Sequence, residues 1–169
     1  APASLVAELA SNLVDVSSAE RSEMEPITPE RRIAEIPSQP VELGREVPIM
    51  PTRRHVPEGQ QVDYSTRPPT SGDHWSQWAR CGFYEDGLPD ERITHNLEHG
   101  NVVVSYNLAS QSQVSDLREV MDSIPPAADW GVARFYDQIP RGTVVLAVWG
   151  RIYALDAIDR DQIARFFDE

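Results

Sequence analysis

The four histidines of this chain, His55, His74, His95 and His99, all lie between residues 55 and 99. His95 and His99 stand four residues apart, which turns both imidazoles to the same side of a helix. A strand would also place residues 95, 97 and 99 on one face, so either backbone lets the pair converge. A neutral imidazole is a good ligand for copper and zinc. We therefore predict one metal site built from all four histidines.

Copper is the ion we favour for this site, with zinc as the alternative. A nitrogen-rich site holds copper more tightly than zinc by the Irving–Williams order, provided that the protein works outside the cytoplasm. Glu98 is expected off the ligand face, where its carboxylate could orient an imidazole or make a surface or capping contact. The alternative for the histidines is a purely structural role as hydrogen-bonded groups.

Two sulfur-bearing residues are weaker candidates for metal ligands. Cys81 could be a soft ligand beside Trp78, but a buried and inert thiol is the interpretation we prefer. Met121 falls on the apolar face of a predicted helix, so we assign it to the core.

No catalytic motif surrounds these residues. A hydrolytic zinc site would need His-Glu-x-x-His, whereas here Glu98 precedes the second histidine. No serine lies in a nucleophile motif, and no glycine-rich phosphate loop is present. We predict no catalytic residue, and an enzymatic activity has no support in the sequence.

The elements that must position the histidines lie in residues 55–169. Strands are predicted at 61–64, 102–106, 131–136, 143–149 and 152–155. Helices are predicted at 115–124, capped by Ser115 and ended by Pro125-Pro126, and after Asp159, where Asp159 and Gln162 form a capping box. The prolines and glycine of residues 68–74 predict a rigid loop that presents His74. This pattern indicates a compact α+β domain with a central, mainly antiparallel sheet and two or three helices.

Residues 1–54 have a different composition and are predicted to be an N-terminal arm. A short amphipathic helix is expected from Ser4 to about residue 14, followed by an extended, proline-rich segment. Such a segment buries too little surface to order itself alone, so we expect it to pack on its own domain or on a partner.

Composition excludes two classes of partner. The 169-residue chain has a net charge of −12, which argues against nucleic acid and against anionic lipid surfaces. No run of eighteen apolar residues is present, so no transmembrane segment is predicted. The chain begins Ala1-Pro2-Ala3, which fits a product of N-terminal processing and suggests export. A single cysteine leaves the redox compartment open.

Two motifs resemble a widespread prokaryotic family known as a domain of unknown function. They are Pro-Pro-Thr-Ser-Gly-x-His at 68–74 and His-Asn-Leu-Glu-His-Gly at 95–100. His-Val-x-x-Gly at 55–59 and Val-Trp-Gly at 148–150, with valine where the family tends to have alanine, extend the resemblance over about residues 55–169. The resemblance implies a periplasmic or outer-face location and a fold unit, but no activity.

A second hypothesis concerns assembly. An acidic exported domain with a long proline-rich arm is what we expect of a non-catalytic accessory subunit. Residues 1–54 would then lie along a larger membrane complex, such as a respiratory or photosynthetic one. This hypothesis is compatible with a metal site, because a histidine cluster can hold a subunit together without doing chemistry.

Overall fold

The structure is a computed structural model, and it describes residues 43–169. The predicted helix near residues 4–14 and most of the predicted proline-rich arm lie outside the described residues. No helix of the described part is long and apolar enough to cross a membrane.

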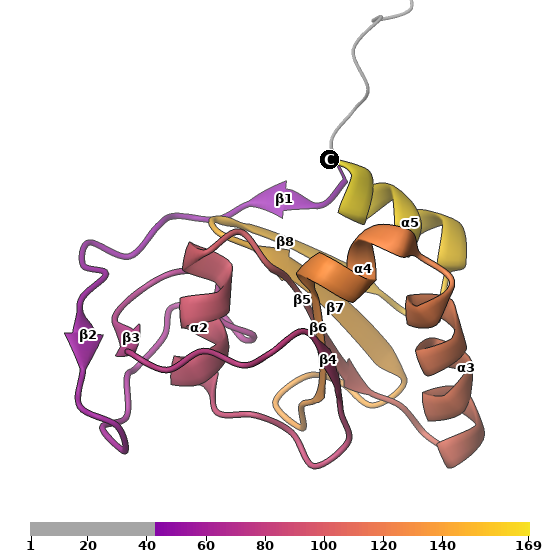
Figure 1. The fold of residues 1–169 in the computed structure, drawn as a ribbon, viewed down its shortest axis with the longest axis horizontal. Helices are drawn as coiled ribbons and strands as arrows, with labels where there is room; N and C mark the ends of the chain where they lie inside the picture. Colours follow the sequence, from indigo (N-terminus) through magenta and orange to yellow (C-terminus); the bar gives the residue numbers. More distant parts are fainter. Residues whose placement is uncertain (1–42) are drawn as a thin grey trace, which may run out of the picture. The chain divides into compact units, whose positions relative to one another are not determined.

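Six strands form one mixed sheet in the order β1-β8-β7-β5-β6-β4 (Figure 1). Pairing is antiparallel from β1 through β5 and parallel where β6 meets β5 and β4. The predicted α+β class is confirmed, and β7 is central because its side chains are buried on both faces. The bounds are β1 Arg45–Glu46, β4 Gly82–Tyr84, β5 Val102–Asn107, β6 Gly131–Phe135, β7 Thr143–Val148 and β8 Arg151–Leu155.

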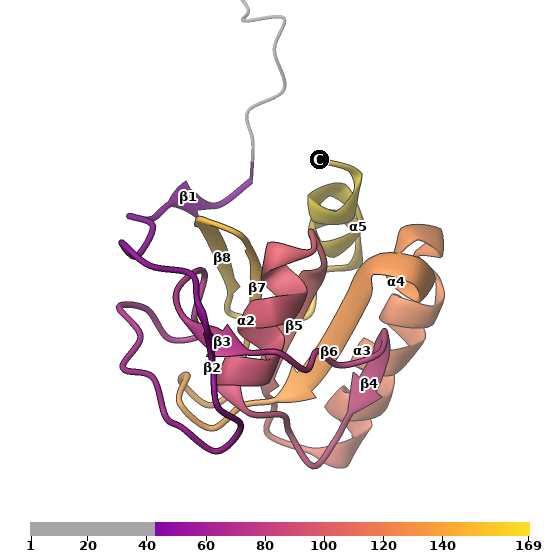
Figure 2. The ribbon, with the colours of Figure 1, turned by 60° about the vertical axis from the view of Figure 1, so that its left-hand side comes forward.

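Helices cover the two faces of this sheet unequally (Figures 1 and 2). One face packs against α3 (Gln111–Asp122), α4 (Pro125–Trp130) and α5 (Arg160–Asp168), and this layer holds the largest apolar cluster. The other face packs against α2 (Asp90–Glu98), which contributes Ile93 and Leu97 to a smaller cluster. Successive strand residues point to opposite faces, so Val104 joins the first cluster and Val103 the second.

The helices differ from prediction in two ways, at the start of α3 and just after its end. Helix α3 begins at Gln111, four residues earlier than expected. Its N-cap is Ser110 and not Ser115, because the Ser110 hydroxyl accepts a hydrogen bond from the Gln113 amide. Pro125 and Pro126 do end α3, but they also open the short helix α4, where proline has no amide to lose. The capping box is confirmed: Asp159 accepts from the Gln162 amide at 3.0 Å and from its side chain at 2.8 Å.

The predicted strand at 61–64 does not form. Its Val62 amide instead donates to the carboxylate of Glu91 at 2.9 Å, so helix α2 replaces a strand neighbour as its partner. A separate two-stranded sheet, β2 (His55–Val56) and β3 (His74–Trp75), stands beside α2 (Figure 1).

The last part of the predicted arm, residues 43–54, runs along the domain. Strand β1 pairs with β8, and Val47 is buried in a small cluster with Val145 and Ile152. This last part of the predicted arm thus packs on its own domain, one of the two packing partners that we expected for it.

Candidate metal centre

Helix α2 carries two of the site residues, His95 and Glu98, and its sequence explains its position. Ile93 and Leu97 are four residues apart and almost fully buried against the sheet, which leaves the site residues on another side of the helix. Gly100 follows at φ +86°, a left-handed conformation that favours glycine and ends the helix. The helical alternative of the two predicted geometries is therefore correct.

A buried ion pair anchors the start of this helix to the sheet. Arg134, 1% exposed on β6, donates to Asp90 at 2.6 Å and to the Leu88 carbonyl at 2.6 Å. Tyr136 donates to the other oxygen of Asp90 at 3.0 Å. Burial and the neighbouring Asp90 raise the pKa of Tyr136 to about 12, so its hydroxyl remains a donor. The sequence did not predict the role of Arg134, because no sequence pattern indicates that an arginine within a strand is buried.

The loop that precedes His74 is held by hydrogen bonds from other segments. The Gly150 amide donates to the Thr70 carbonyl at 3.0 Å, and the Met50 amide donates to the Ser71 hydroxyl at 2.9 Å. The Arg54 amide donates to Asp73 at 2.7 Å, and this bond is the main reason why the pKa of Asp73 is lowered. The predicted rigidity of this loop thus comes from these long-range bonds as well as from its prolines.

Parallel pairing of β2 with β3 brings His55 to the cluster. His55 and His74 are direct neighbours in the register, and the His74 amide donates to the Arg54 carbonyl at 3.0 Å. Their ring centroids are 5.1 Å apart, and each ring lies within 4.9 Å of the His95 ring. Three histidines from three distant segments therefore form one triangle.

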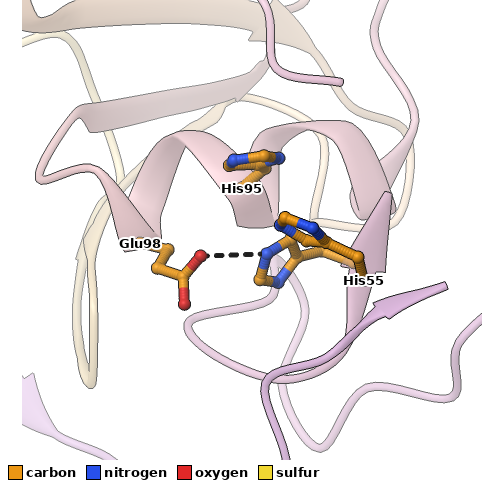
Figure 3. Close-up of side chains that lie close together, drawn as sticks. His55, His95 and Glu98 are labelled. Atoms are coloured by element: carbon orange, nitrogen blue, oxygen red, sulfur yellow. Dashed lines mark ion pairs between the residues drawn. The ribbon is translucent and has the colours of Figure 1, made fainter. Parts of the chain in front are cut away.

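His55, His74, His95 and Glu98 make up a donor set that could hold a metal ion. One ligand atom from each lies within 4.8 Å of the others. Figure 3 shows His55 reaching toward His95 and Glu98, which both leave the same helix. His74 and His95 are buried at 0% and 3% exposure, whereas His55 is exposed and the Glu98 side chain is 27% exposed. The set therefore has a buried side and a side that faces solvent.

The hydrogen bonds fix which ring nitrogen is free to bind an ion. Nδ1 of His74 is 2.9 Å from the Gly72 carbonyl, and Nδ1 of His95 is 2.7 Å from the Trp75 carbonyl. A carbonyl can only accept, so both Nδ1 atoms donate and both Nε2 atoms carry a lone pair in the neutral rings. Histidines that bind metals are oriented in this same way by backbone carbonyls.

One atom of the set has no hydrogen-bond partner among residues 43–169. Nε2 of His74 is fully buried and unsatisfied, although Oε2 of Glu98 is only 3.1 Å away. Two lone-pair atoms facing each other repel, so a cation or a proton between them would stabilise the arrangement. The carboxylate of Glu98 thus lies among the donors and not off the ligand face, as the sequence had led us to expect.

His99 lies beside this set and not within it. Its Nε2 is 2.8 Å from Nε2 of His95, and the two rings are nearly parallel with centroids 4.7 Å apart. Trp78 packs against both rings, with centroid distances of 5.1 Å to His95 and 5.0 Å to His99. The structure thus gathers all four predicted histidines, with Glu98 rather than His99 in the four-donor group.

The cluster disfavours protonation of its central ring. Burial lowers the pKa of His95 below its ordinary value of 6.5, and repulsion from the other three histidines adds to this effect. The hydrogen bond to the Trp75 carbonyl acts in the opposite direction. A neutral imidazole is the form that binds metals, so His95 is kept in the competent state.

Neither sulfur residue joins the donor set: Met121 is a core residue, as predicted, whereas Cys81 is half-buried and not buried as we expected. The Cys81 thiol contacts the Asp129 carbonyl at 3.0 Å, and burial raises its pKa, which keeps the thiol protonated at neutral pH. Met121 is 7% exposed within the larger core cluster.

Asn96 is a further residue that sequence reasoning missed. Its side chain is buried, accepts from the Ala79 amide at 2.8 Å and donates to the Ala79 carbonyl at 2.8 Å. It also donates to the Asn101 side chain at 3.1 Å. Asn96 therefore fastens the loop that carries Trp78 to the helix that carries His95. The one signal in the sequence was its place between two site residues.

Residues 55–169 match the family model described as "Protein of unknown function (DUF3105)". The chain belongs to this family. The match covers every histidine of the cluster and every strand from β2 onward, while β1 lies before it. Searches of curated proteins and of solved structures find no match.

Proposed function

We propose that this domain binds one transition-metal ion through His55, His74, His95 and Glu98, and that the ion is copper in preference to zinc. The observation that carries the proposal is the buried Nε2 of His74, which has no hydrogen-bond partner in the described part of the chain and faces the Glu98 carboxylate at 3.1 Å. An ion there would meet one nitrogen from each of three imidazole rings. Backbone carbonyls hold Nδ1 of His74 and of His95, and strand pairing holds His55 in place.

The choice of copper rests on the donor set. Three nitrogens and one carboxylate oxygen form a mixed set that accepts both Cu²⁺ and Zn²⁺, and the Irving–Williams order favours Cu²⁺. A second function, proton storage between His74 and Glu98, fits the same contact, because a proton on Nε2 would also relieve the repulsion. We favour the metal because a proton would not require His55 and His95 to converge on the same point.

The test is metal binding by untagged, chelator-treated protein. Calorimetric titration with Cu²⁺ and with Zn²⁺ should give one site per chain, with tighter binding of Cu²⁺, and the copper form should show nitrogen hyperfine structure in its electron paramagnetic resonance spectrum. Removal of a direct ligand should weaken affinity by at least about 100-fold, because substitution of residues that only hydrogen-bond to the ligands already weakens it by about 10–100-fold.

His55→Ala is the most informative variant, because His55 is exposed and its loss leaves no buried cavity. Glu98→Gln tests the carboxylate, and Glu119→Gln, an exposed carboxylate on α3, is its matched control. Wild-type protein that retains neither ion, or a His55→Ala variant that binds as tightly as wild type, would contradict the metal site.

We also propose an extracytoplasmic location and a role as an accessory subunit of a larger membrane complex that binds through the N-terminal arm. The support is the sequence of residues 1–54 and the family resemblance described above. Because residues 43–54 pack on the domain, a deletion test should stop at residue 40. Unchanged co-purification of neighbouring proteins with the shortened chain would refute the docking role.

A further inference from the structure

His99 is hydrogen-bonded to the very atom of His95 that an ion would need. Nδ1 of His95 donates to the Trp75 carbonyl, so Nε2 of His95 is an acceptor in the neutral ring. The Nε2 of His99, 2.8 Å away, must therefore carry the hydrogen and donate it. An ion can bind His95 only if this hydrogen bond opens.

We propose that His99 is the exchange ligand of the site: it closes His95 in the metal-free protein and binds the ion transiently during loading and release. This proposal rests on the proposed metal-binding function and assigns a kinetic role to a residue outside the four-donor set.

The position of His99 suits such a role. His95 and His74 are buried, whereas His99 is exposed and caps the carboxyl end of α2. Its backbone amide is 3.2 Å from the His95 carbonyl and 3.1 Å from that of Asn96, so its backbone is tied to the last helical turn. Beyond it, a Cβ built on Gly100 would meet no atom of residues 43–169 within 4 Å. The His99 ring thus lies at the exposed end of the helix and belongs to none of the apolar clusters.

Binding of the ion by His99 and its transfer to His95 require no net gain or loss of protons. When the hydrogen bond opens, Nε2 of His99 keeps its hydrogen, so no proton has to leave or enter the ring. The lone pair of the other ring nitrogen of His99, Nδ1, is then free to bind an arriving ion. Transfer of the ion from His99 to Nε2 of His95 forms one metal–nitrogen bond as another breaks.

Trp78 keeps the His99 ring near His95. Its indole stands against both rings and is 55% exposed, and the two hydrogen bonds between Asn96 and Ala79 hold its loop in place. Because Cu²⁺ quenches the fluorescence of a neighbouring indole, Trp78 also makes the exchange step observable.

The experiment follows the release of Cu²⁺ from loaded, untagged, full-length protein to excess EDTA by stopped-flow fluorescence, together with equilibrium titration. For His99→Ala we expect a dissociation constant within about fivefold of wild type, the scale of one neutral hydrogen bond. We expect the release of Cu²⁺ from this variant to be about tenfold slower than from wild type. This is the lower end of the 10–100-fold effect on affinity or activity that is typical of residues contacting metal ligands. His55→Ala, which removes a permanent ligand, should instead weaken equilibrium binding. Trp78→Phe, followed by absorbance, should release copper faster than His99→Ala does.

Two outcomes would overturn this proposal alone. If His99→Ala weakens equilibrium binding as much as His55→Ala does, His99 is a permanent ligand. If it changes neither the equilibrium nor the release rate, His99 is a surface residue without a part in exchange. Wild-type protein that binds no copper would instead remove the proposed function on which the inference rests.

Discussion

The two faces of the central sheet are stabilised by different kinds of interaction. On the face covered by α3, α4 and α5, apolar side chains fill one large cluster, and burial of area is the stabilising term. On the face covered by α2, a small apolar cluster supports a set of buried polar groups, among them His74, Asn96 and Arg134. Each of these polar groups depends on a specific partner.

This difference teaches where the site is vulnerable. Apolar packing tolerates substitutions of similar volume, because contacts are numerous and non-directional. A hydrogen-bonded cluster does not, because a missing partner leaves a buried polar atom unsatisfied. We therefore expect stability and metal binding to respond separately to changes on the two faces.

The largest effect is expected from a matched pair of leucines. Leu117 is fully buried on α3 and Leu97 is 1% exposed on α2. Leu117→Ala and Leu97→Ala should each lower the free energy of unfolding by about 2–5 kcal/mol, through lost burial and a residual cavity. Only Leu97→Ala should also weaken copper binding, because Leu97 seats the helix that carries His95 and Glu98. Denaturant unfolding and calorimetric titration measure the two quantities, and equal losses of affinity would erase the distinction between the faces.

A smaller effect is expected from loss of the hydrogen bonds that join Asn96 to the loop carrying Trp78. Asn96→Ala leaves the amide and carbonyl of Ala79 without their partner and should cost about 1–3 kcal/mol. The Trp78 loop should loosen, which would increase the exposure of its indole to an external quencher. Asn107→Ala is the control, since Asn107 donates to the Ile139 carbonyl away from α2. An unchanged quenching constant in Asn96→Ala would contradict the fastening role.

The smallest effect is expected from pH. The pKa of His95 is lower in the folded protein than the 6.5 of the free side chain, so the unfolded chain takes up a proton first as the solution is acidified. His95 therefore contributes stability that is complete above pH 6.5 and is lost as the pH falls toward its folded pKa. Metal-free wild type should lose stability as the pH falls below 6.5, and the slope should be shallower in His95→Gln. Parallel slopes in the two proteins would refute this assignment. The lowered pKa of Asp73 acts at more acidic pH, as the pH falls through its ordinary value of 3.8.

Much of the fold could be predicted from the sequence, and the failures share a cause. Strands β5, β7 and β8 and helix α5 follow from apolar periodicity and a capping box, which act over a few residues. Strands β2 and β3, each two residues long, carry no such pattern, because their pairing depends on segments about twenty residues apart. The strand expected at 61–64 failed because the Glu91 carboxylate, on another element, takes its amide.

By itself the sequence determined which residues could do chemistry here: four histidines confined to residues 55–99, two of them at helical spacing, next to a glutamate. Only the tertiary structure decided that Glu98 joins the donor set, that His99 stands outside it, and that a buried arginine and asparagine hold the surrounding segments. The reason is physical. Spacing along a chain specifies the side of a local element, whereas the direction of a lone pair depends on carbonyl groups that distant segments bring to it.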